Sequence, residues 1–463
     1  MRSLFSEEEK RARWRKAWLA LAEAEHDLGL VTKREVEDIR LESGRDKVDV
    51  EEALEIEDKI RHDLMSELRV FSAHAKHGGG KLHLGATSAD IEDNTDIALY
   101  LGAIQIIVSR LVACLQAARE RILRHRATAC MGWTHLQPAE PTTLGYRFAN
   151  YAQDLLLDLS FAEFVTERFL LAKGVKGAVG TSASFKALLG TSTKPRKLEA
   201  SVMKKLGLRP FEVSTQTYPR KVDFVILAWL AAAAQSCHRF GLDVRVMQSP
   251  GFGEWSEPSG ENQVGSSAMP FKRNPVQAER MCSLARLVSV LPEVGFLNAA
   301  NSILERTLDD SAARRIVIPE AFLAVDECLL IFERLFRGLE VHPEMVRRNL
   351  RSYGPFAGTE AVLMKLVEKG GDRQKMHELI RGKSSLAWQD VLKGEKNPLE
   401  RLLAADRSVS SMIETKELHA MMDPSSYTGD AEERCTRFVH NQLDPALARY
   451  KSGARSRKTP AST

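Results

Sequence analysis

Polar residues with acid–base and anion-binding chemistry gather in residues 265–275, whose sequence is GSSAMPFKRNP. The segment holds two hydroxyl groups, on Ser266 and Ser267, and two cations, Lys272 and Arg273. Apolar helical sequence lies on both sides, and ordering a polar, glycine-punctuated loop costs conformational entropy. Long loops in compact domains are usually lids or binding loops. A plain surface linker has a similar composition, and loop physics alone leaves both interpretations open.

Four further segments interrupt the helical pattern with polar side chains of catalytic type. They are Arg61-His62-Asp63, His83–Ser88 followed by Asp93-Asn94, Gly132–Ala139 (GWTHLQPA) and Glu305–Arg315 (ERTLDDSAARR). Each segment has an ordinary structural interpretation when taken alone. His62 is then a solvated helix histidine and His135 a turn histidine, while Thr87-Ser88 caps the next helix. The arginines of the last segment are then a solvated helix face.

The composition is that of a soluble globular protein. The chain has 463 residues, of which 44% are hydrophobic and 28% are charged, and this length allows several domains or one large elongated domain. The formal net charge of +4 gives no reason to expect a nucleic-acid partner. We expect no membrane partner, because even the apolar run 102–118 is interrupted by Arg110.

Cysteine usage and the N-terminus favour a cytoplasmic protein. The six cysteines lack CxxC spacing, and we expect buried free thiols in a reducing compartment. The N-terminus is charged within a few residues and has no apolar region of a secretory signal. We find no spacing typical of metal ligands and expect no cofactor. The basic tail, residues 452–463, is rich in small and polar residues and is expected to be disordered.

Helical periodicity dominates the chain. Apolar residues recur at helical spacing at Trp14, Ala17, Trp18 and Leu21, and Gly29 ends this run. We find no series of alternating strands with hairpin signals, no dinucleotide-binding glycine motif and no P-loop. The sequence therefore predicts an all-α fold.

Two long helices are predicted in the middle of the chain, over residues 142–172 and 222–242. The second is apolar on all sides, and a helix of that kind must be buried by its neighbours. It fits the centre of a helical bundle, including one that other subunits complete. We divide the chain near Thr87 and Glu340, which gives an N-terminal helical domain (1–87), a central long-helix bundle domain (88–340) and a C-terminal helical domain (341–463).

Together and in this order, the five polar segments resemble the fumarase/aspartase superfamily of lyases, and within it the adenylosuccinate lyase family of the animal type. Residues 265–275 are similar to the defining loop of the superfamily, 83–88 (HLGATS) to its first segment and 134–139 (THLQPA) to its second. Residues 216–223 and 305–315 resemble the adenylosuccinate lyase branch in particular. The likeness covers nearly the whole chain. It implies an all-helical, three-domain subunit and a homotetramer, in which long central helices form a common bundle and three subunits build each active site.

The resemblance implies a carbon–nitrogen lyase that releases fumarate by anti β-elimination. Its substrates would be adenylosuccinate, giving AMP, and SAICAR, giving AICAR, in purine biosynthesis, without a cofactor. By resemblance Ser266 is the base that removes a proton α to a carboxylate, and Lys272 stabilises the resulting negative charge. By resemblance His135 is the acid that protonates the departing nitrogen, with Glu279 as its carboxylate partner. His62 is the second histidine of the site.

By the same resemblance ten further residues bind the substrate. Thr87, Ser88, Thr134 and Gln216 match residues that hold the succinyl carboxylates, Arg306, Ser311 and Arg315 match the phosphate side, and Asp63, Asn274 and Arg280 complete the set. Ser311 and Arg315 are four residues apart and share one helix face. Asn274-Pro275 predicts the N-cap and first residue of a helix. Arg314 is expected to be structural, and Asp309 or Asp310 to cap the helix that carries Arg315.

The sequence leaves two alternatives to this function open. Another fumarate-releasing lyase, such as argininosuccinate lyase, would have no use for a phosphate-binding set of arginines. A non-catalytic relative would have no reason to keep Ser266, His135, Lys272 and Glu279. Animal-type members usually carry an earlier Arg-Tyr pair that contacts the phosphate, and we find no counterpart to it here. The stretch 250–261 is also unusually rich in glycine and serine.

Overall fold

The computed structural model describes residues 1–260, 268–269 and 271–456 of the chain, with side chains as far as residue 450. Ser266, the predicted base, lies outside the described residues. The chain forms two compact units, each assembled from three stretches of sequence. Unit 1 comprises Met1–Arg110, Asp158–Gln235 and Leu284–Leu329, and unit 2 comprises Leu111–Leu157, Ser236–Ser283 and Leu330–Thr463. The division at 87 and 340 stays a prediction.

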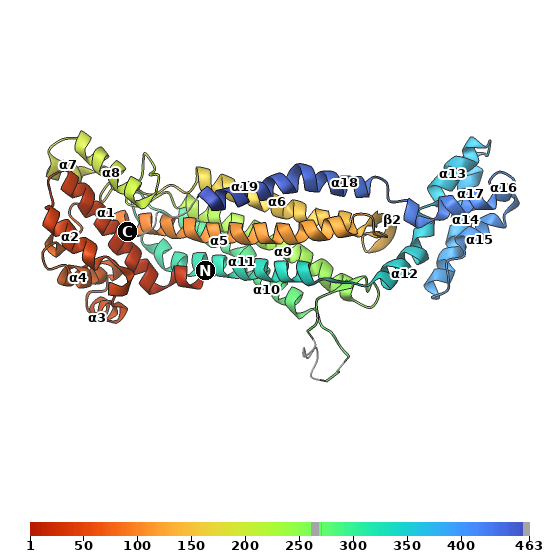
Figure 1. Ribbon diagram of the computed structural model, residues 1–463, viewed down its shortest axis with the longest axis horizontal. Coiled ribbons are helices and arrows are strands. Elements are labelled where there is room, and N and C mark those ends of the chain that lie inside the picture. The colour runs from red at the N-terminus through yellow and green to blue at the C-terminus, as the bar shows by residue number, and fades with distance from the viewer. Residues whose placement is uncertain (261–267, 270, 457–463) are drawn as a thin grey trace. The chain divides into compact units, whose positions relative to one another are not determined.

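Helices make up most of both units, which confirms the predicted all-α fold (Figure 1). Five long helices each contribute residues to both units: α5 (Ser88–His125), α6 (Leu144–Arg168), α9 (Lys221–Gln248), α10 (Val276–Ala300) and α11 (Asp309–Gly338). The shorter helices of unit 1 are η1 (Arg2–Phe5), α1 (Glu7–Asp27), α2 (Lys33–Glu42), η2 (Arg45–Lys47), α3 (Val50–Ile60), α4 (Asp63–His74), η3 (Gly79–Lys81), α7 (Ala183–Leu189) and α8 (Thr193–Leu206).

Unit 2 adds short strands and the C-terminal helices. The strands are β1 (Ala129–Thr134), β2 (Gln137–Thr143), β3 (Trp255–Ser256) and β4 (Glu340–Val341), paired β1–β2 and β3–β4. The helices are α12 (Pro343–Tyr353), η4 (Gly354–Phe356), α13 (Thr359–Glu368), α14 (Arg373–Leu392), α15 (Leu399–Ala404), α16 (Arg407–Ser410), α17 (Thr415–Met422), η5 (Pro424–Ser426), α18 (Ala431–Phe438), η6 (Val439–Leu443) and α19 (Asp444–Ser456).

Helix α9 is buried as its all-apolar surface predicts. Ile226 and Trp229 are fully buried, and the Trp229 indole Nε1 donates to the Asp158 carbonyl at 3.0 Å. Helix α10 approaches α9 closely at Gly295, where an added Cβ would lie 3.0 Å from the Cα of Phe224. Small residues at such crossings let helix backbones pack tightly, so the glycine sets the spacing of these two helices in unit 1.

Aromatic side chains fill the core of unit 2 between the long helices. The Phe240 ring on α9 lies 4.5 Å from Phe332 and 5.0 Å from Phe336 on α11, measured between centroids. Tyr151 on α6 packs against Phe240 at 5.2 Å. Such rings bury large apolar areas and hold the helices at fixed spacing.

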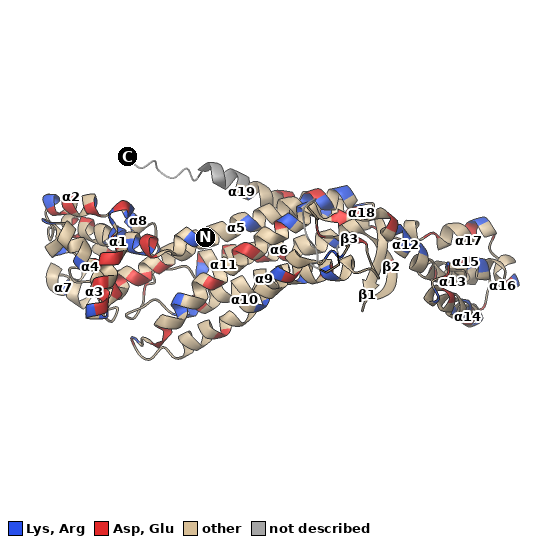
Figure 2. Ribbon diagram, turned by 90° about the horizontal axis from the view of Figure 1, so that it is seen from below, with Lys and Arg blue, Asp and Glu red and all other residues tan. Residues whose placement is uncertain are grey.

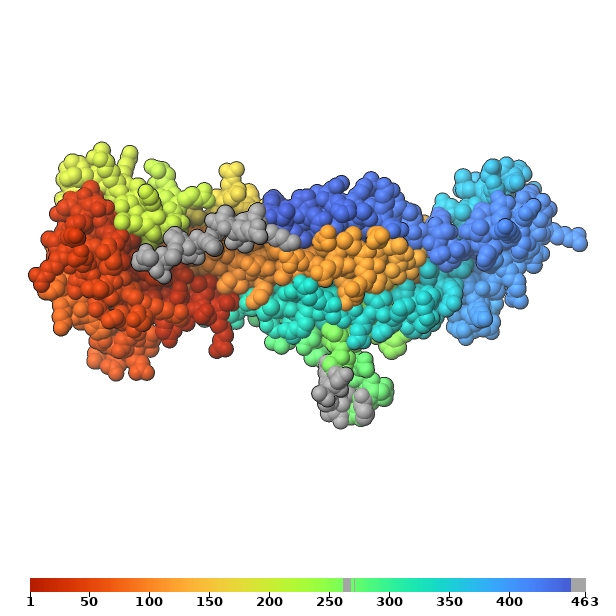
Figure 3. Space-filling model, in the orientation of Figure 1, coloured from red at the N-terminus to blue at the C-terminus, as the bar shows by residue number. Residues whose placement is uncertain are grey.

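The C-terminal helices of unit 2 return along the second half of α5. In the space-filling view the α18–α19 segment, drawn in blue, lies beside the orange α5 (Figure 3). The Arg119 guanidinium on α5 donates to the Asp444 carboxylate at 2.5 Å. Acidic and basic residues both occur along α18 and over α1–α4 of unit 1 (Figure 2). This mixture of signs agrees with the small net charge.

A β-hairpin occupies a position where the sequence predicted helix or loop. Strands β1 and β2 are antiparallel, with Ala129 opposite Thr143 and Thr134 opposite Gln137. The predicted long helix 142–172 is therefore wrong at its ends, because residues 142–143 belong to β2 and α6 runs from Leu144 to Arg168. The ladder pairing and the packing around it override the local propensity of β2, which contains two prolines.

Two other sequence predictions are settled by the fold. All six cysteines are free and buried, as expected. The tail prediction is wrong for its first residues, since α19 continues through Ser456.

Helices α5 and α10 are long and apolar enough to cross a membrane by length and composition alone. A buried core helix of a soluble protein passes the same test, so length and composition alone are weak evidence for a membrane span.

Candidate active site

In unit 1, the starts of α4 and α5 bring predicted site residues into contact. His62 is the N-cap residue of α4, and its ring Nε2 lies 3.4 Å from the Ser88 hydroxyl at the start of α5. The other ring nitrogen, Nδ1, lies 3.7 Å from the Asp63 carboxylate. Asp63 in turn forms an ion pair with Arg315 of α11, at 2.7 Å between Oδ2 and NH1. Four predicted residues from three segments of the sequence therefore form one cluster.

The Asp63–Arg315 pair places a charged guanidinium at the surface of this cluster. Burial alone would raise the pKa of the Asp63 carboxyl, but the Arg315 charge outweighs it and the pKa is lowered. The same carboxylate helps to raise the pKa of Arg315. The Arg315 side chain is 53% exposed, so it can exchange its carboxylate partner for a ligand anion.

Glu92, one turn beyond Ser88 on α5, belongs to the same cluster and was missed by sequence reasoning. Burial, followed by the neighbouring Asp63 and Asp96 carboxylates, raises the pKa of Glu92 to about 8. Residues four apart on a helix share a face, so the spacing from Ser88 is the signal that could have found it. A group held neutral at ordinary pH beside an exposed arginine is typical of a functional site.

The loop that carries Thr87 is anchored from two sides. His83 has a left-handed backbone with φ of 63°, and its Nδ1 accepts from the Trp18 indole at 3.1 Å. The Ser184 hydroxyl donates to the Gly85 carbonyl at 2.6 Å. Burial lowers the pKa of His83, in agreement with a ring nitrogen that accepts a hydrogen bond. His83 is therefore a structural support of the loop.

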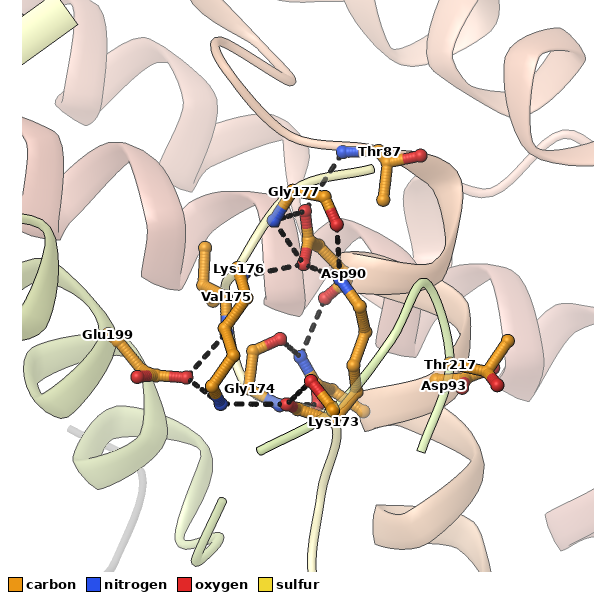
Figure 4. Close-up of polar contacts among 12 residues, drawn as sticks. Thr87, Asp90, Asp93, Lys173, Gly174, Val175, Lys176, Gly177, Glu199 and Thr217 are labelled. Carbon is orange, nitrogen blue, oxygen red and sulfur yellow. Dashed lines mark hydrogen bonds and ion pairs between the residues drawn. The ribbon is translucent and has the colours of Figure 1, made fainter. Parts of the chain in front are cut away.

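Asp90 ties Thr87 to a second loop, residues 173–177 (Figure 4). The Asp90 carboxylate accepts from the Thr87 amide at 2.9 Å and from the Gly177 amide at 3.1 Å. It also accepts from the Lys176 amide at 3.0 Å and pairs with the buried Lys173 ammonium. The Thr87 carbonyl also accepts from the Asp90 amide at 2.9 Å, so a fully bonded buried carboxylate fixes the position of Thr87 at the start of α5.

Gln216 and Arg306 lie on adjoining segments of unit 1. The backbone N–H of Gln216 donates to the backbone carbonyl of Glu305 at 3.2 Å. Gln216 therefore lies beside Glu305, which directly precedes Arg306. Arg306 lies 3.9 Å from Asp310. The side chains of Gln216, Arg306 and Ser311 are half-buried. The predicted carboxylate-binding and phosphate-binding segments are therefore neighbours.

Beneath this surface, buried ion pairs of Arg220, the residue before α9, join α5 to α11. Arg220 donates to both oxygens of Asp93 at 3.1 Å and to Asp310 at 2.7 Å. The Asp310 part of the capping prediction is wrong, because Asp310 lies inside α11 and is bonded to Arg220. Asp309 is the first residue of α11 and accepts from the Thr307 hydroxyl at 3.0 Å.

Arg314 is structural, as expected. Its guanidinium donates to Asp223 at 2.6 Å and to Asp96 and Tyr100 at 3.1 and 3.2 Å. Burial would lower the pKa of Arg314, but Asp223 and the other partners raise it well above its ordinary value. Arg314 is thus saturated with internal partners, and its neighbour Arg315 faces outward.

In unit 2, the hairpin presents Thr134 and His135 at its tip. His135 and Leu136 form the two-residue turn between β1 and β2, with φ of 54° and 59°. Two positive φ values in succession are typical of a type I′ turn, which normally favours Asn and Gly. Thr134 and His135 are exposed. The adjacent Trp133 ring packs on Phe252 at 4.8 Å, so the hairpin has a firm base.

The remaining predicted residues lie at the start of α10. This helix begins at Val276, one residue later than predicted, and the Pro275 carbonyl accepts from the Glu279 amide at 2.9 Å. Lys272, Glu279 and Arg280 are exposed, and Asn274 is half-buried. His135 and Glu279, both within the described residues, are not joined by a hydrogen bond or ion pair, so their pairing stays a prediction.

Glu257 supports the start of α10 and was also missed from the sequence. Its carboxylate accepts from the Gln277 amide at 3.2 Å and from the Ala278 amide at 2.5 Å. These are amides that a helix start leaves without an internal partner. Burial raises the pKa of Glu257. For residues 1–260, 268–269 and 271–456, we find no group of three or more His, Cys, Asp or Glu placed to bind a metal.

Comparison with known proteins decides the family. A model of the lyase family matches residues 3–289, and a model of the adenylosuccinate lyase C-terminus matches residues 355–438. The adenylosuccinate lyase of Schistosoma mansoni is 39% identical over 455 residues, which cover 96% of this chain and 93% of that protein. The chain belongs to the adenylosuccinate lyase family. The family member from Saccharomyces cerevisiae is 37% identical over 456 residues, covering 97% and 94% of the two chains.

Solved structures agree with this assignment at the level of the fold. A fumarate lyase from Mesorhizobium sp. BNC1 superposes with a TM-score of 0.83 at 24% identity, over 95% of this chain and 97% of that one. A 3-carboxy-cis,cis-muconate lactonizing enzyme from Pseudomonas putida gives 0.85 at 24% identity, over 96% and 97%. The chain therefore has the all-α fold of this superfamily and is a lyase of the adenylosuccinate lyase family.

Proposed function

We propose that this lyase eliminates fumarate from adenylosuccinate, giving AMP, and from SAICAR, giving AICAR. The observation that carries the proposal is the identity of 39% to an adenylosuccinate lyase over nearly the full length of both chains. The unit 1 cluster supports it, because a hydroxyl (Ser88), an imidazole (His62) and an exposed guanidinium (Arg315) suit a substrate that carries both carboxylates and a phosphate.

The elimination divides its work between two proton transfers. The Ser266 oxygen, as an alkoxide that the positive charge of Lys272 favours, takes the proton α to the carboxylate and becomes a hydroxyl. Lys272 also stabilises the negative charge that then develops on that carboxylate. His135 gives a proton to the nitrogen as the C–N bond breaks. Its place on a tight two-residue turn supports this role, because the turn projects the imidazole from a rigid hairpin rather than from a free loop.

Substrate binding would use the residues of unit 1. Thr87 and Ser88 hold the succinyl carboxylates at the start of α5, where the helix dipole favours an anion. Arg315 and Arg306 bind the phosphate. Because Arg315 is paired with Asp63 in the free protein, the phosphate competes with a carboxylate that already orients the guanidinium.

We further propose that the enzyme is a homotetramer whose active sites combine residues of three subunits. Half-exposed apolar side chains support this, since Leu287, Val290 and Phe296 of α10 are 46%, 59% and 55% exposed. Apolar side chains repeated along one helix usually mark a protein–protein interface. Sedimentation equilibrium of the purified protein tests the stoichiometry, and a monomer at micromolar concentration would contradict it.

The activity test follows the loss of adenylosuccinate by ultraviolet absorbance, with SAICAR as the second substrate. We expect turnover of both, and we expect Ser266→Ala and His135→Ala to abolish it. The exposed Ser385→Ala and His377→Ala on α14 are the matched controls and should keep full activity. A folded wild-type protein that turns over neither substrate would indicate the non-catalytic relative.

Subunit mixing tests the shared site. Ser266→Ala and His135→Ala subunits that are unfolded and reassembled together should regain part of the activity, because some sites would draw both intact residues from different chains. No recovery after proven subunit exchange would contradict a composite site. Turnover of argininosuccinate in the same assay would indicate the alternative function, argininosuccinate lyase.

A further inference from the structure

We propose that Glu92 is a substrate-binding residue of this enzyme, which donates a hydrogen bond from its carboxylic acid to the phosphate held by Arg315. The proposal rests on the proposed function, since it names a partner for the same substrate. It concerns a residue that the sequence motifs do not include.

Glu92 lies on the same face of α5 as Ser88. Ser88, Glu92 and Asp96 follow each other at intervals of four residues and share one helix face. Ser88 at one end contacts His62 of α4 at 3.4 Å, and Asp96 at the other end contacts Arg314 of α11 at 3.1 Å. Glu92 therefore lies one turn beyond Ser88, on the face of α5 that also carries the Asp96 contact to α11.

The Glu92 side chain makes no structural bond within the described residues. Its neighbours on α5 are engaged, since Asp93 accepts from Arg220 and Asp96 from Arg314. Among the described residues, Glu92 forms no hydrogen bond and no ion pair. A half-buried carboxyl group that serves no structural bond, on a face lined by ligand-binding side chains, is available to a ligand.

Carboxylates outnumber cations around Glu92. The charges that act on Glu92 are those of Asp93 and Asp96 on its own helix, Asp63 at the start of α4 and Arg315 on α11, and Asp63 is itself acted on by His62 and Lys10. Arg315, the one cation of this set that acts on Glu92, is already paired with Asp63. Burial and the surrounding carboxylates raise the pKa of Glu92 to about 8, so at neutral pH the group is a neutral acid.

A neutral carboxyl group can stand beside a phosphate where a carboxylate could not. The acid donates its O–H to a phosphate oxygen, whereas the ionised form would repel a dianion at short range. When the phosphate replaces Asp63 as the partner of Arg315, the carboxylic acid of Glu92 donates a further hydrogen bond to that phosphate. Binding of the phosphate should therefore weaken as Glu92 ionises.

The experiment compares kcat/KM for adenylosuccinate from pH 6.5 to 9.5 in wild type, Glu92→Gln and Glu92→Ala. With a pKa of about 8, one tenth of Glu92 stays protonated at pH 9, so this group alone should lower wild-type kcat/KM about tenfold, through KM. Glu92→Gln keeps a donor that does not ionise, and its KM should stay flat over this range. Glu92→Ala should have a raised KM already at pH 7.

Parallel pH profiles of KM in wild type and Glu92→Gln would overturn the proposal. Glu120→Gln, at an exposed position on the same helix, is the matched control and should follow wild type.

Succinyladenosine, the substrate without its phosphate, tests whether Glu92 acts on the phosphate. With succinyladenosine, the Glu92 variants should have the same KM as wild type. An unchanged effect would overturn the assignment to the phosphate. Thermal melts of each variant identify a folding defect, and absence of wild-type turnover would instead count against the proposed function.

Discussion

The buried carboxyl group of Glu25 should make the stability of this protein fall as pH rises. Glu25 lies on α1 with none of its surface exposed, and neither carboxyl oxygen has a hydrogen-bond partner. Burial raises the pKa of Glu25 from 4.5 to about 8, against a smaller opposing effect of Lys81. The folded chain therefore binds a proton at neutral pH that the unfolded chain releases.

The sign and size follow from proton linkage. A carboxyl pKa raised in the folded state means that the unfolded state binds fewer protons between pH 4.5 and 8, so stability is highest below 4.5 and is lost as pH rises through 8. At pH 7 the loss is about 3–4 kcal/mol, from the difference of 2.5 between pH 7 and 4.5 at about 1.4 kcal/mol for each unit of pH.

Glu25→Gln should remove this loss, because the amide has nearly the same size and does not ionise. The amide also needs hydrogen-bond partners that the site lacks, so we expect a net gain of about 1–3 kcal/mol at pH 7. For 463 residues that unfold as one unit, this corresponds to a rise in melting temperature of about 1–3 °C.

The measurement is a thermal melt by circular dichroism or calorimetry at pH 5, 6, 7 and 8. The difference between Glu25→Gln and wild type should be smallest at pH 5 and increase up to pH 8. Glu37→Gln on α2, a residue with 55% of its side chain exposed, controls for the loss of one negative charge and should show no such trend. A difference that is constant with pH, or largest at pH 5, would refute the reasoning.

Three further substitutions test other parts of the structure. Arg314→Ala leaves the buried Asp223 and the half-buried Asp96 without their cation and should cost about 3–5 kcal/mol of unfolding free energy, measured by urea denaturation. Gly295→Ala places a methyl group 2.9 Å from the Leu227 side chain and 3.0 Å from the Phe224 backbone and should cost about 1–3 kcal/mol; an unchanged midpoint would show that α10 shifts freely. Arg315→Lys removes the planar fork and should raise KM for adenylosuccinate about tenfold with little change in kcat, whereas a lower kcat at constant KM would contradict a role in phosphate binding.

The fold was largely predictable because its elements depend on local periodicity. The apolar surface of α9 indicated a buried helix, and Trp229 is fully buried. The β1–β2 hairpin was not predictable in this way. Its turn residues, His135 and Leu136, lack the Asn-Gly signal, and two prolines weaken the strand pattern of β2. Pairing across the ladder, which the local sequence does not reveal, stabilises it.

The residues of the candidate site were predictable from the sequence, but their burial and the charges around them were not. Motif resemblance pointed to His62, Asp63, Ser88 and Arg315, and the structure brings these four together. It did not point to Glu92, whose character depends on the helices packed around it. Burial and neighbouring charges are set by tertiary contacts, so a shifted pKa cannot be read from spacing alone.

The interleaving of the two units constrains how the chain can fold during its synthesis. Unit 1 needs residues as far as Leu329, and unit 2 needs residues from Leu111 to the C-terminal helices. At a translation rate of about 5–20 residues per second, the ribosome needs roughly 15–65 s to supply all of unit 1. Apolar helices such as α5 and α9 are therefore made well before the segments that bury them. A nascent chain of this kind depends on protection from aggregation, and neither unit can be expressed as one uninterrupted fragment.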